Sequence, residues 1–116
     1  MSSILRIDPG TRMSQAVVAN GFIFLAGQVA ADPSQDVEHQ TQQVLAEIDR
    51  LLAAAGADKQ HILTANVYLA DIGDFAAMNR AWDAWVAPDA KPARATIQAA
   101  LAAPEYRVEI QVTALA

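Results

Sequence analysis

Residues 16–27 read AVVANGFIFLAG and contain the strongest structural signal in the chain. Asn20-Gly21 separates two apolar segments, and both residues tolerate the positive φ angles of a type I′ turn. The sequence therefore predicts a β-hairpin with strands over 16–19 and 22–27. Because Phe22–Leu25 contains no alternating polar residue, we expect this second strand to be buried on both faces.

Periodicity extends the prediction to both sides of this hairpin. Apolar residues recur every three or four positions over 36–55 and 75–86, which is typical of amphipathic helices. Gly56 and Pro88 follow these segments and are expected to end the helices. Two more strands are predicted where apolar and polar residues alternate, over 4–7 and 61–69.

The C-terminal quarter has the pattern of a second hairpin. Apolar and polar residues alternate over 95–101 and again over 106–114, and a turn is expected at Ala102–Glu105. Any register that joins the two apolar faces also gathers the polar residues on one common side. These polar residues are Arg94, Thr96, Gln98, Arg107, Glu109, Gln111 and Thr113.

Together the elements have the order β-β-β-α-β-α-β-β, which indicates the α+β class and a single domain over residues 1–116. A mostly antiparallel sheet of six strands, about 4.8 Å apart, is roughly 29 Å wide, and two helices of about 10 Å each cover only one of its faces. Since the other face needs a cover, we predict a homo-oligomer in which sheet faces pack together.

Composition restricts the function classes. The 116 residues carry 8 Lys and Arg against 13 Asp and Glu, a formal charge of −5, so we expect no nucleic-acid partner. With no cysteine and only two histidines, His39 and His61, we expect no metal site, no thiolate chemistry and no cofactor. The longest apolar run, Phe22–Ala26, is far shorter than the roughly 20 residues that span a bilayer. Since no secretory signal is visible either, we expect a cytoplasmic protein without a membrane partner.

Arg94 and Glu109 are the strongest candidates for chemistry. An arginine presents a planar fork that binds a carboxylate through two hydrogen bonds, so Arg94 on the polar face suits a small carboxylate ligand. Glu109 lies mid-strand, where glutamate is unfavoured, and it could orient or deprotonate a water molecule. The alternatives are a solvated Arg94, and a Glu109 that faces solvent or pairs with Arg107.

Other polar residues carry weaker signals. Gly27-Gln28 ends a predicted strand, where glycine permits the close approach of a ligand or subunit. Asn79 lies among apolar residues of the second predicted helix and could position a ligand. The remaining residues favour structural roles, with His39 and His61 at the surface, Trp82 and Trp85 in the core or an interface, and Ser14 outside any catalytic triad.

Several motifs, taken together, resemble the reactive intermediate deaminase family, also called RidA or YjgF-type. These motifs are SQAVV at 14–18, AGQ at 26–28, DFAAMN at 74–79, PARAT at 92–96 and RVEIQV at 107–112. They occur in order over nearly the whole chain. The resemblance implies a chorismate-mutase-like fold and a homotrimer with ligand clefts between its subunits.

The resemblance also implies an activity, the hydrolysis of 2-imino acids, formed from enamines such as 2-aminoacrylate, to 2-keto acids and ammonia without a cofactor. In this interpretation Arg94 binds the substrate carboxylate and Glu109 positions the attacking water. The implied substrate-binding residues are Thr96, Gly27, Gln28, Asn79 and Met13.

This chain departs from the archetypal family pattern at two of these residues, and the departure at Met13 keeps a second hypothesis open. Met13 stands where archetypal members carry tyrosine, and Thr96 stands where they often carry cysteine. Without the phenol, the same cleft could belong to a non-catalytic protein that binds 2-keto acids or another small metabolite. Endoribonuclease activity, attached to some relatives, is disfavoured by the negative charge and by the lack of a histidine acid/base pair.

Overall fold

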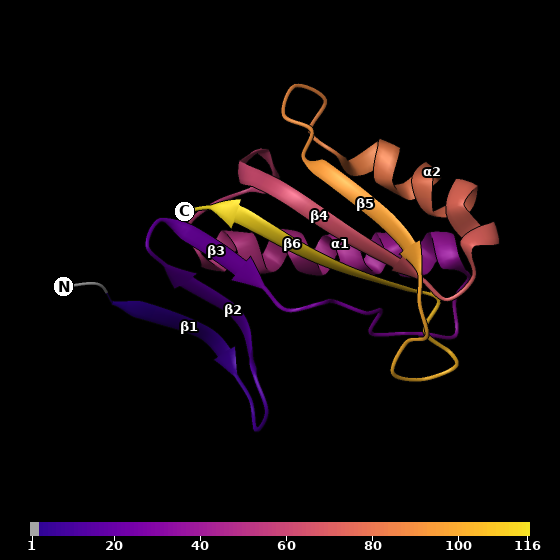
Figure 1. Cartoon of the computed structure of the whole chain (residues 1–116), viewed down its shortest axis with the longest axis horizontal. Helices are drawn as coiled ribbons and strands as arrows, with labels where there is room; N and C mark the ends of the chain where they lie inside the picture. The colour runs from indigo at the N-terminus through magenta and orange to yellow at the C-terminus, as the bar shows by residue number, and fades with distance from the viewer. Residues whose placement is uncertain (1–2) are drawn as a thin grey trace.

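The computed structural model describes residues 3–116 and has the predicted α+β class and element order (Figure 1). The strands are β1 (Ile4–Pro9), β2 (Ser14–Ala19), β3 (Phe22–Leu25), β4 (Ile62–Leu69), β5 (Ala93–Gln98) and β6 (Val108–Leu115). The helices are α1 (Val37–Ala54) and α2 (Phe75–Trp85). A short 3₁₀ turn, η1 (Lys59–His61), follows α1, and a second one, η2 (Ile72–Asp74), directly precedes α2. The predicted order β-β-β-α-β-α-β-β is therefore confirmed.

The first hairpin forms as predicted. Asn20 and Gly21 have φ angles of 52° and 81°, as a type I′ turn requires, and Ala19 pairs with Phe22 across it. In the single chain the residues of β3 alternate in burial, so the prediction that both of its faces are buried depends on association through the second face. Ile23 and Leu25 are buried, whereas Phe22 and Phe24 are 37% and 44% exposed.

The predicted C-terminal hairpin is also wrong. The strand order is β1-β2-β3-β6-β4-β5, so β6 lies between β3 and β4 and does not touch β5 as a neighbour. β5 instead pairs in parallel with β4, after the chain has crossed over through α2, and the sheet is mixed. The reason lies in burial: Val108, Ile110, Val112 and Ala114 of β6 are all fully buried, which suits a central strand with two partners.

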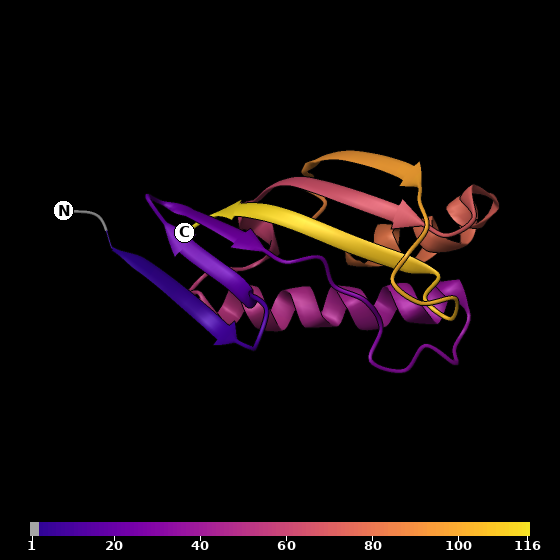
Figure 2. The same cartoon turned by 60° about the horizontal axis from the view of Figure 1, so that its bottom comes forward.

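Both helices pack on one face of the sheet (Figure 2). The buried stripe of α1 includes Val44, Ile48 and Leu51, and Asp36 caps its N-terminus by accepting a hydrogen bond from the His39 amide at 2.9 Å. At the other end of α1, Gly56 adopts a φ of 83°, as expected for a residue that ends a helix. None of the helices within residues 3–116 combines the length and apolar character needed to cross a membrane.

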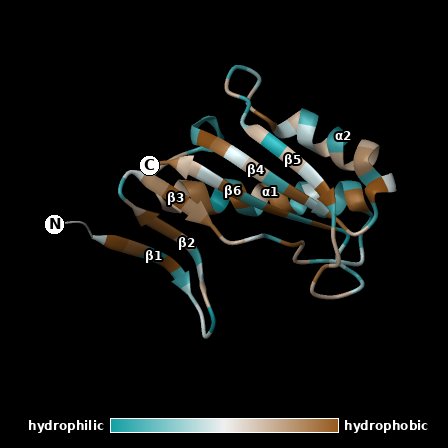
Figure 3. Ribbon diagram, in the orientation of Figure 1, coloured by the Kyte–Doolittle hydropathy of each residue, from teal (hydrophilic) through white to brown (hydrophobic). Residues whose placement is uncertain are grey.

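No helix within residues 3–116 covers the second face of the sheet. On this open face the Phe22 and Phe24 rings lie 6.1 Å apart, and Ile97 and Leu115 are also exposed. Figure 3 shows hydrophobic residues along β1, β2 and β3, the three strands at one end of the sheet. Association through the open face stays a prediction, and the exposed aromatic pair is the kind of surface that such an interface covers.

Candidate functional site

The strand registers assign Arg94 and Glu109 to opposite faces of the sheet. Arg94 pairs with Ala65, which is buried beneath the helices, so Arg94 points to the helix-covered side. Glu109 pairs with Tyr68, the residue between the buried Val67 and Leu69, so Glu109 belongs to the open face. The predicted common polar face is therefore wrong, because it depended on a hairpin that does not form.

Arg94 lies against the inner side of α2. Its Nη1 atom is 3.9 Å from the Met78 sulfur, and its guanidinium carbon is 4.9 Å from the centre of the Trp82 ring and 5.9 Å from that of Phe75. Cation–π contacts of this kind contribute about 0.5–2 kcal/mol each and hold the guanidinium plane in place. Among the described residues, no carboxylate lies within ion-pair distance of Arg94.

This setting leaves a partly desolvated cation with unused donors. Burial lowers the pKa of Arg94, and the charge of Asp83 opposes this effect without making a direct contact. An arginine nevertheless keeps its proton at neutral pH, so its N–H groups remain available to an anion. Thr96, two residues along on the same face, has a buried hydroxyl with no hydrogen-bond partner among the described residues.

A hollow of about 280 Å³ adjoins Arg94. It lies along the paired strands β4 and β5 and is lined by Thr64, Ala65, Asn66, Ala93, Arg94 and Ala95. Because β5 is an edge strand, this hollow opens at the border of the sheet. Thr64, Asn66, Ala93 and Ala95 alternate with Ala65 and Arg94 along the two strands, so the hollow lies chiefly on the open face, on the opposite side of β5 from the Arg94 guanidinium.

Glu109 and Gly27 form a second close group on the open side. A methyl group added at Gly27 would overlap the Glu109 carboxylate and lie 2.9 Å from its Cδ atom. Gly27 is placed there by its neighbour Gln28, whose amide donates to the Ile110 carbonyl at 2.8 Å and whose carbonyl accepts from the Ile110 amide at 3.1 Å. The absence of a side chain at Gly27 is thus what admits the half-buried carboxylate.

Polar side chains of the neighbouring strands continue this group. Asn66 donates to the Gln111 side chain at 3.2 Å, and Gln111 donates to the Leu25 carbonyl at 3.1 Å. Asn66 and Gln111 are partners in register on the face that also holds Tyr68 and Glu109. This face therefore has a polar centre beside the exposed Phe22 and Phe24.

The other predicted ligand residues have different surroundings. Gln28 is 7% exposed, and its side-chain amide donates to Gln15 Oε1 at 2.9 Å and to the Ala26 carbonyl at 3.0 Å, so it braces the loop that carries Gly27. Asn79 is half-buried on α2, the helix that packs on Arg94. Met13 directly precedes β2, and its side chain is 56% exposed. The structure brings together Gly27 with Glu109, and Arg94 with α2, as two separate groups.

Known proteins are similar to this chain in sequence and fold over almost its whole length. The family profile described as endoribonuclease L-PSP matches residues 3–116. A RutC family protein of Haemophilus ducreyi is 53% identical over 111 residues, which cover 96% of this chain and 95% of that protein. The chain belongs to the RidA/YjgF/RutC family.

Further relatives support this membership. The RutC family protein YoaB of Escherichia coli is 45% identical over 112 residues, which cover 97% of each chain. The crystal structure of a YjgF family member from Neisseria meningitidis is 51% identical and has a TM-score of 0.95, with coverage of 97% of this chain and 94% of that chain. The RidA/YjgF/RutC fold is therefore shared by this protein, including the mixed sheet and the place of β6.

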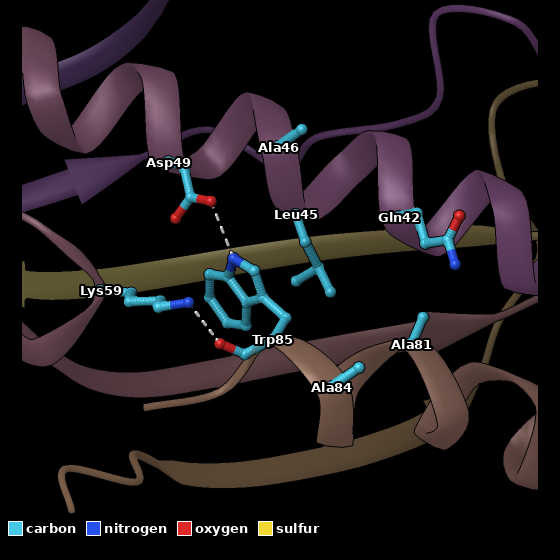
Figure 4. A pocket seen from close by; sticks show the side chains of 8 residues that line it. All are labelled: Gln42, Leu45, Ala46, Asp49, Lys59, Ala81, Ala84 and Trp85. Atoms are coloured by element: carbon cyan, nitrogen blue, oxygen red, sulfur yellow. Dashed lines mark hydrogen bonds between the residues drawn. The ribbon is translucent and has the colours of Figure 1, made fainter. Parts of the chain in front are cut away.

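In this RidA/YjgF/RutC protein the groove between α1 and α2 is less suitable for chemistry than the surroundings of Arg94 and Glu109 (Figure 4). It measures about 270 Å³ and is lined mostly by Leu45, three alanines and Trp85. Its two charged side chains are already paired, because the Trp85 indole donates to Asp49 at 2.9 Å and Lys59 donates to the Trp85 carbonyl at 2.6 Å. None of the predicted site residues lines this groove.

Sequence reasoning missed the partners of Arg94 in this RidA/YjgF/RutC protein. Phe75, Met78 and Trp82 recur at helical spacing, and of these three only Trp82 was given a role, in the core or an interface. The available signal was that a stripe of two aromatic rings and a thioether also suits a guanidinium plane.

Among the described residues, no cluster of three or more His, Asp or Glu side chains could hold a metal ion.

Proposed function

We propose that this chain hydrolyses 2-imino acids, formed from enamines such as 2-aminoacrylate, to 2-keto acids and ammonia. The observation that carries the proposal is Arg94, a half-buried guanidinium held by aromatic rings without a carboxylate partner among the described residues. Because a cation removed from water is costly unless it is paired, such a site favours an anionic ligand. The substrate carboxylate supplies that anion.

In the proposed reaction Arg94 binds the substrate carboxylate through two N–H donors, and Thr96 and Asn79 line the same half of the cleft. Glu109 accepts a proton from water while the water oxygen adds to the imine carbon. Glu109 passes this proton to the imine nitrogen, which gives a neutral carbinolamine with one new C–O bond. The Glu109 carboxylate then takes the proton of the carbinolamine hydroxyl and delivers it to the amine nitrogen. As the C–N bond breaks, ammonia departs and the C–O bond becomes the carbonyl of the 2-keto acid.

Since Arg94 and Glu109 lie on opposite faces of one sheet, we propose that two copies complete each cleft. One copy contributes the Arg94 group, and its neighbour contributes Glu109 with Gly27. In a homotrimer with cyclic symmetry every copy then donates both groups, each to a different cleft. The exposed Phe22 and Phe24 on the open face support an interface of this kind.

The activity is tested by generating 2-aminoacrylate with a serine-consuming enzyme and measuring the release of pyruvate and ammonia. We expect the purified protein to accelerate the release above the spontaneous rate, and Arg94→Ala to abolish the acceleration. No acceleration by the wild-type protein would contradict the proposal. Saturable binding of pyruvate without turnover would favour the non-catalytic alternative instead.

The shared cleft is tested by complementation. Arg94→Ala and Glu109→Gln are each expected to be inactive, and refolding the two together at equal amounts should restore about a quarter of the wild-type activity. That fraction follows because, in a random mixture of copies, about one cleft in four receives both intact groups. Mixtures without any recovered activity would show that each cleft is built from one chain.

The ribonuclease activity named by the family profile has less support in this chain. His39 and His61 are exposed, His39 in the first turn of α1 and His61 at the end of η1, and their ring nitrogens contact Asp36 at 2.7 Å and Asp58 at 3.2 Å. Neither histidine is hydrogen-bonded to Arg94 or Glu109 among the described residues. The net charge of −5 also opposes the binding of a polyanion.

A further inference from the structure

Two contacts fix the start of α2 to the strands that carry the candidate residues. Arg107, two residues before Glu109, donates from Nη2 to Asp74 Oδ2 at 2.7 Å. Gln98, at the end of β5, accepts a hydrogen bond from the Ile72 amide at 2.9 Å through its side-chain oxygen. The turn that opens α2 is therefore attached to β5 on one side and to the start of β6 on the other.

Asp74 precedes α2 as its N-cap residue, where an aspartate usually accepts a hydrogen bond from a backbone amide of the first helical turn, but its side chain does not do so. In α1, by contrast, the N-cap residue Asp36 accepts from the His39 amide. The Asp74 side chain is 21% exposed and is directed to Arg107, so its carboxylate joins α2 to the sheet and leaves its own helix end uncapped.

Arg107 is itself held firmly through its backbone. Its amide donates to the side-chain oxygen of Gln40 at 2.9 Å, and its carbonyl accepts from the Ala70 amide at 3.1 Å. Gln40 is fully buried, and its Nε2 group donates to carbonyls of two loops, at Pro33 and at Glu105, both at 3.0 Å. These hydrogen bonds fix the backbone of Arg107, and its ion pair with Asp74 therefore fixes the start of α2 relative to the sheet.

The helix fixed in this way covers Arg94. Phe75 directly follows Asp74, and Phe75, Met78 and Trp82 are the α2 residues in contact with the guanidinium. We propose that Asp74 and Arg107 are positioning residues that hold α2 against Arg94 and so set the affinity for the substrate carboxylate. The inference rests on the proposed function, in which Arg94 binds that carboxylate.

The test compares Asp74→Asn, Arg107→Gln and the double variant. Each single variant is expected to raise KM for the imino acid, and Kd for 2-oxobutanoate, about tenfold. The value of kcat should stay within about threefold, because Glu109 is held by its ladder with β4 and not by the ion pair. The double variant should lose no more affinity than either single one, because both remove the same interaction.

Two further variants separate positioning from general stability. Glu38→Gln breaks another ion pair of α2, between Arg80 and Glu38 at 2.8 Å, and should change KM by less than about twofold. Asp74→Glu retains the charge and should recover part of the lost affinity. Binding is followed by tryptophan fluorescence, since Trp82 lies 4.9 Å from the Arg94 guanidinium carbon.

The outcomes are distinguishable. Variants that lower the melting temperature but leave KM and Kd unchanged would overturn the positioning role, and so would additive losses in the double variant. If the wild-type protein binds 2-oxobutanoate without hydrolysing imines, the proposed function fails while the positioning role is still judged on Kd. If it binds no 2-oxobutanoate at all, both proposals fail.

Discussion

Arg94 of β5 and Arg107, directly before β6, both contact α2 or its N-cap residue, and their surroundings differ. Arg107 donates to the Asp74 carboxylate at 2.7 Å, so its charge is balanced within the chain. Arg94 contacts aromatic rings and a thioether, and burial lowers its pKa. Asp83 influences Arg94 only through its charge and does not form an ion pair with it.

The difference separates an arginine that is paired within the chain from one whose donors are available to a ligand. A guanidinium that already holds a carboxylate has its charge balanced, and its removal chiefly disturbs the packing of α2. A guanidinium flanked by rings keeps its N–H edge free while its orientation is fixed. The predictions below examine the unpaired arginine first, then the Glu109 group on the opposite face of the sheet.

The largest effect is expected from Arg94→Ala. The variant loses two charge-assisted hydrogen bonds to the substrate carboxylate, each worth about 1.5–3 kcal/mol, so kcat/KM should fall by roughly 10²- to 10⁴-fold. Steady-state imine hydrolysis measures this loss. The matched control, Arg12→Ala, removes an exposed arginine near the first strands and should keep kcat/KM within about twofold. Equal activity of the two variants would remove Arg94 from the site.

Glu109→Gln should have the next largest effect and should act on kcat. The amide fits beside Gly27 but cannot accept the proton of water, so kcat should decrease about 10²-fold. The Kd for 2-oxobutanoate should change less than about threefold, since the carboxylate is bound by Arg94. Calorimetric titration measures this Kd, and a large loss of affinity would show that Glu109 binds the ligand.

Gly27→Ala tests the close approach that admits the Glu109 carboxylate. The added methyl group overlaps the carboxylate and should displace it, which we expect to lower kcat about 10-fold without preventing folding. Gly10→Ala is the matched control, because its methyl group would meet only the Met13 carbonyl at an ordinary 3.6 Å. If Gly27→Ala retains wild-type kcat, the approach of these two residues has no bearing on catalysis.

The smallest effect is expected from pH. Burial lowers the pKa of Arg94, so ligand affinity would decrease as the pH rises toward that pKa. Because arginine stays protonated far above neutral pH even so, Kd for 2-oxobutanoate should be constant from about pH 6 to about pH 9. Fluorescence titration over this range measures it. A decrease in affinity below pH 9 would mean that another group carries the charge.

Local sequence patterns predicted the elements and several site residues. The turn at Asn20-Gly21 and the apolar stripe of α1 depend on neighbours in the chain, and both are confirmed. Gly27 and Glu109 were each singled out as candidates, and the structure brings them into contact. The aromatic partners of Arg94 could not be assigned in this way, because helical spacing shows which α2 residues share a face and not what that face meets.

The sequence by itself determined the α+β class, the element order and the family, since these follow from local periodicity and from motifs along the chain. Only the tertiary structure decided that β6 inserts between β3 and β4, and that Arg94 and Glu109 therefore lie on opposite faces. Alternation with a period of two specifies which residues share a face of one strand, but the partner of that strand depends on long-range burial. The fully buried face of β6 places it in the centre of the sheet, and its position separates the two halves of the candidate site.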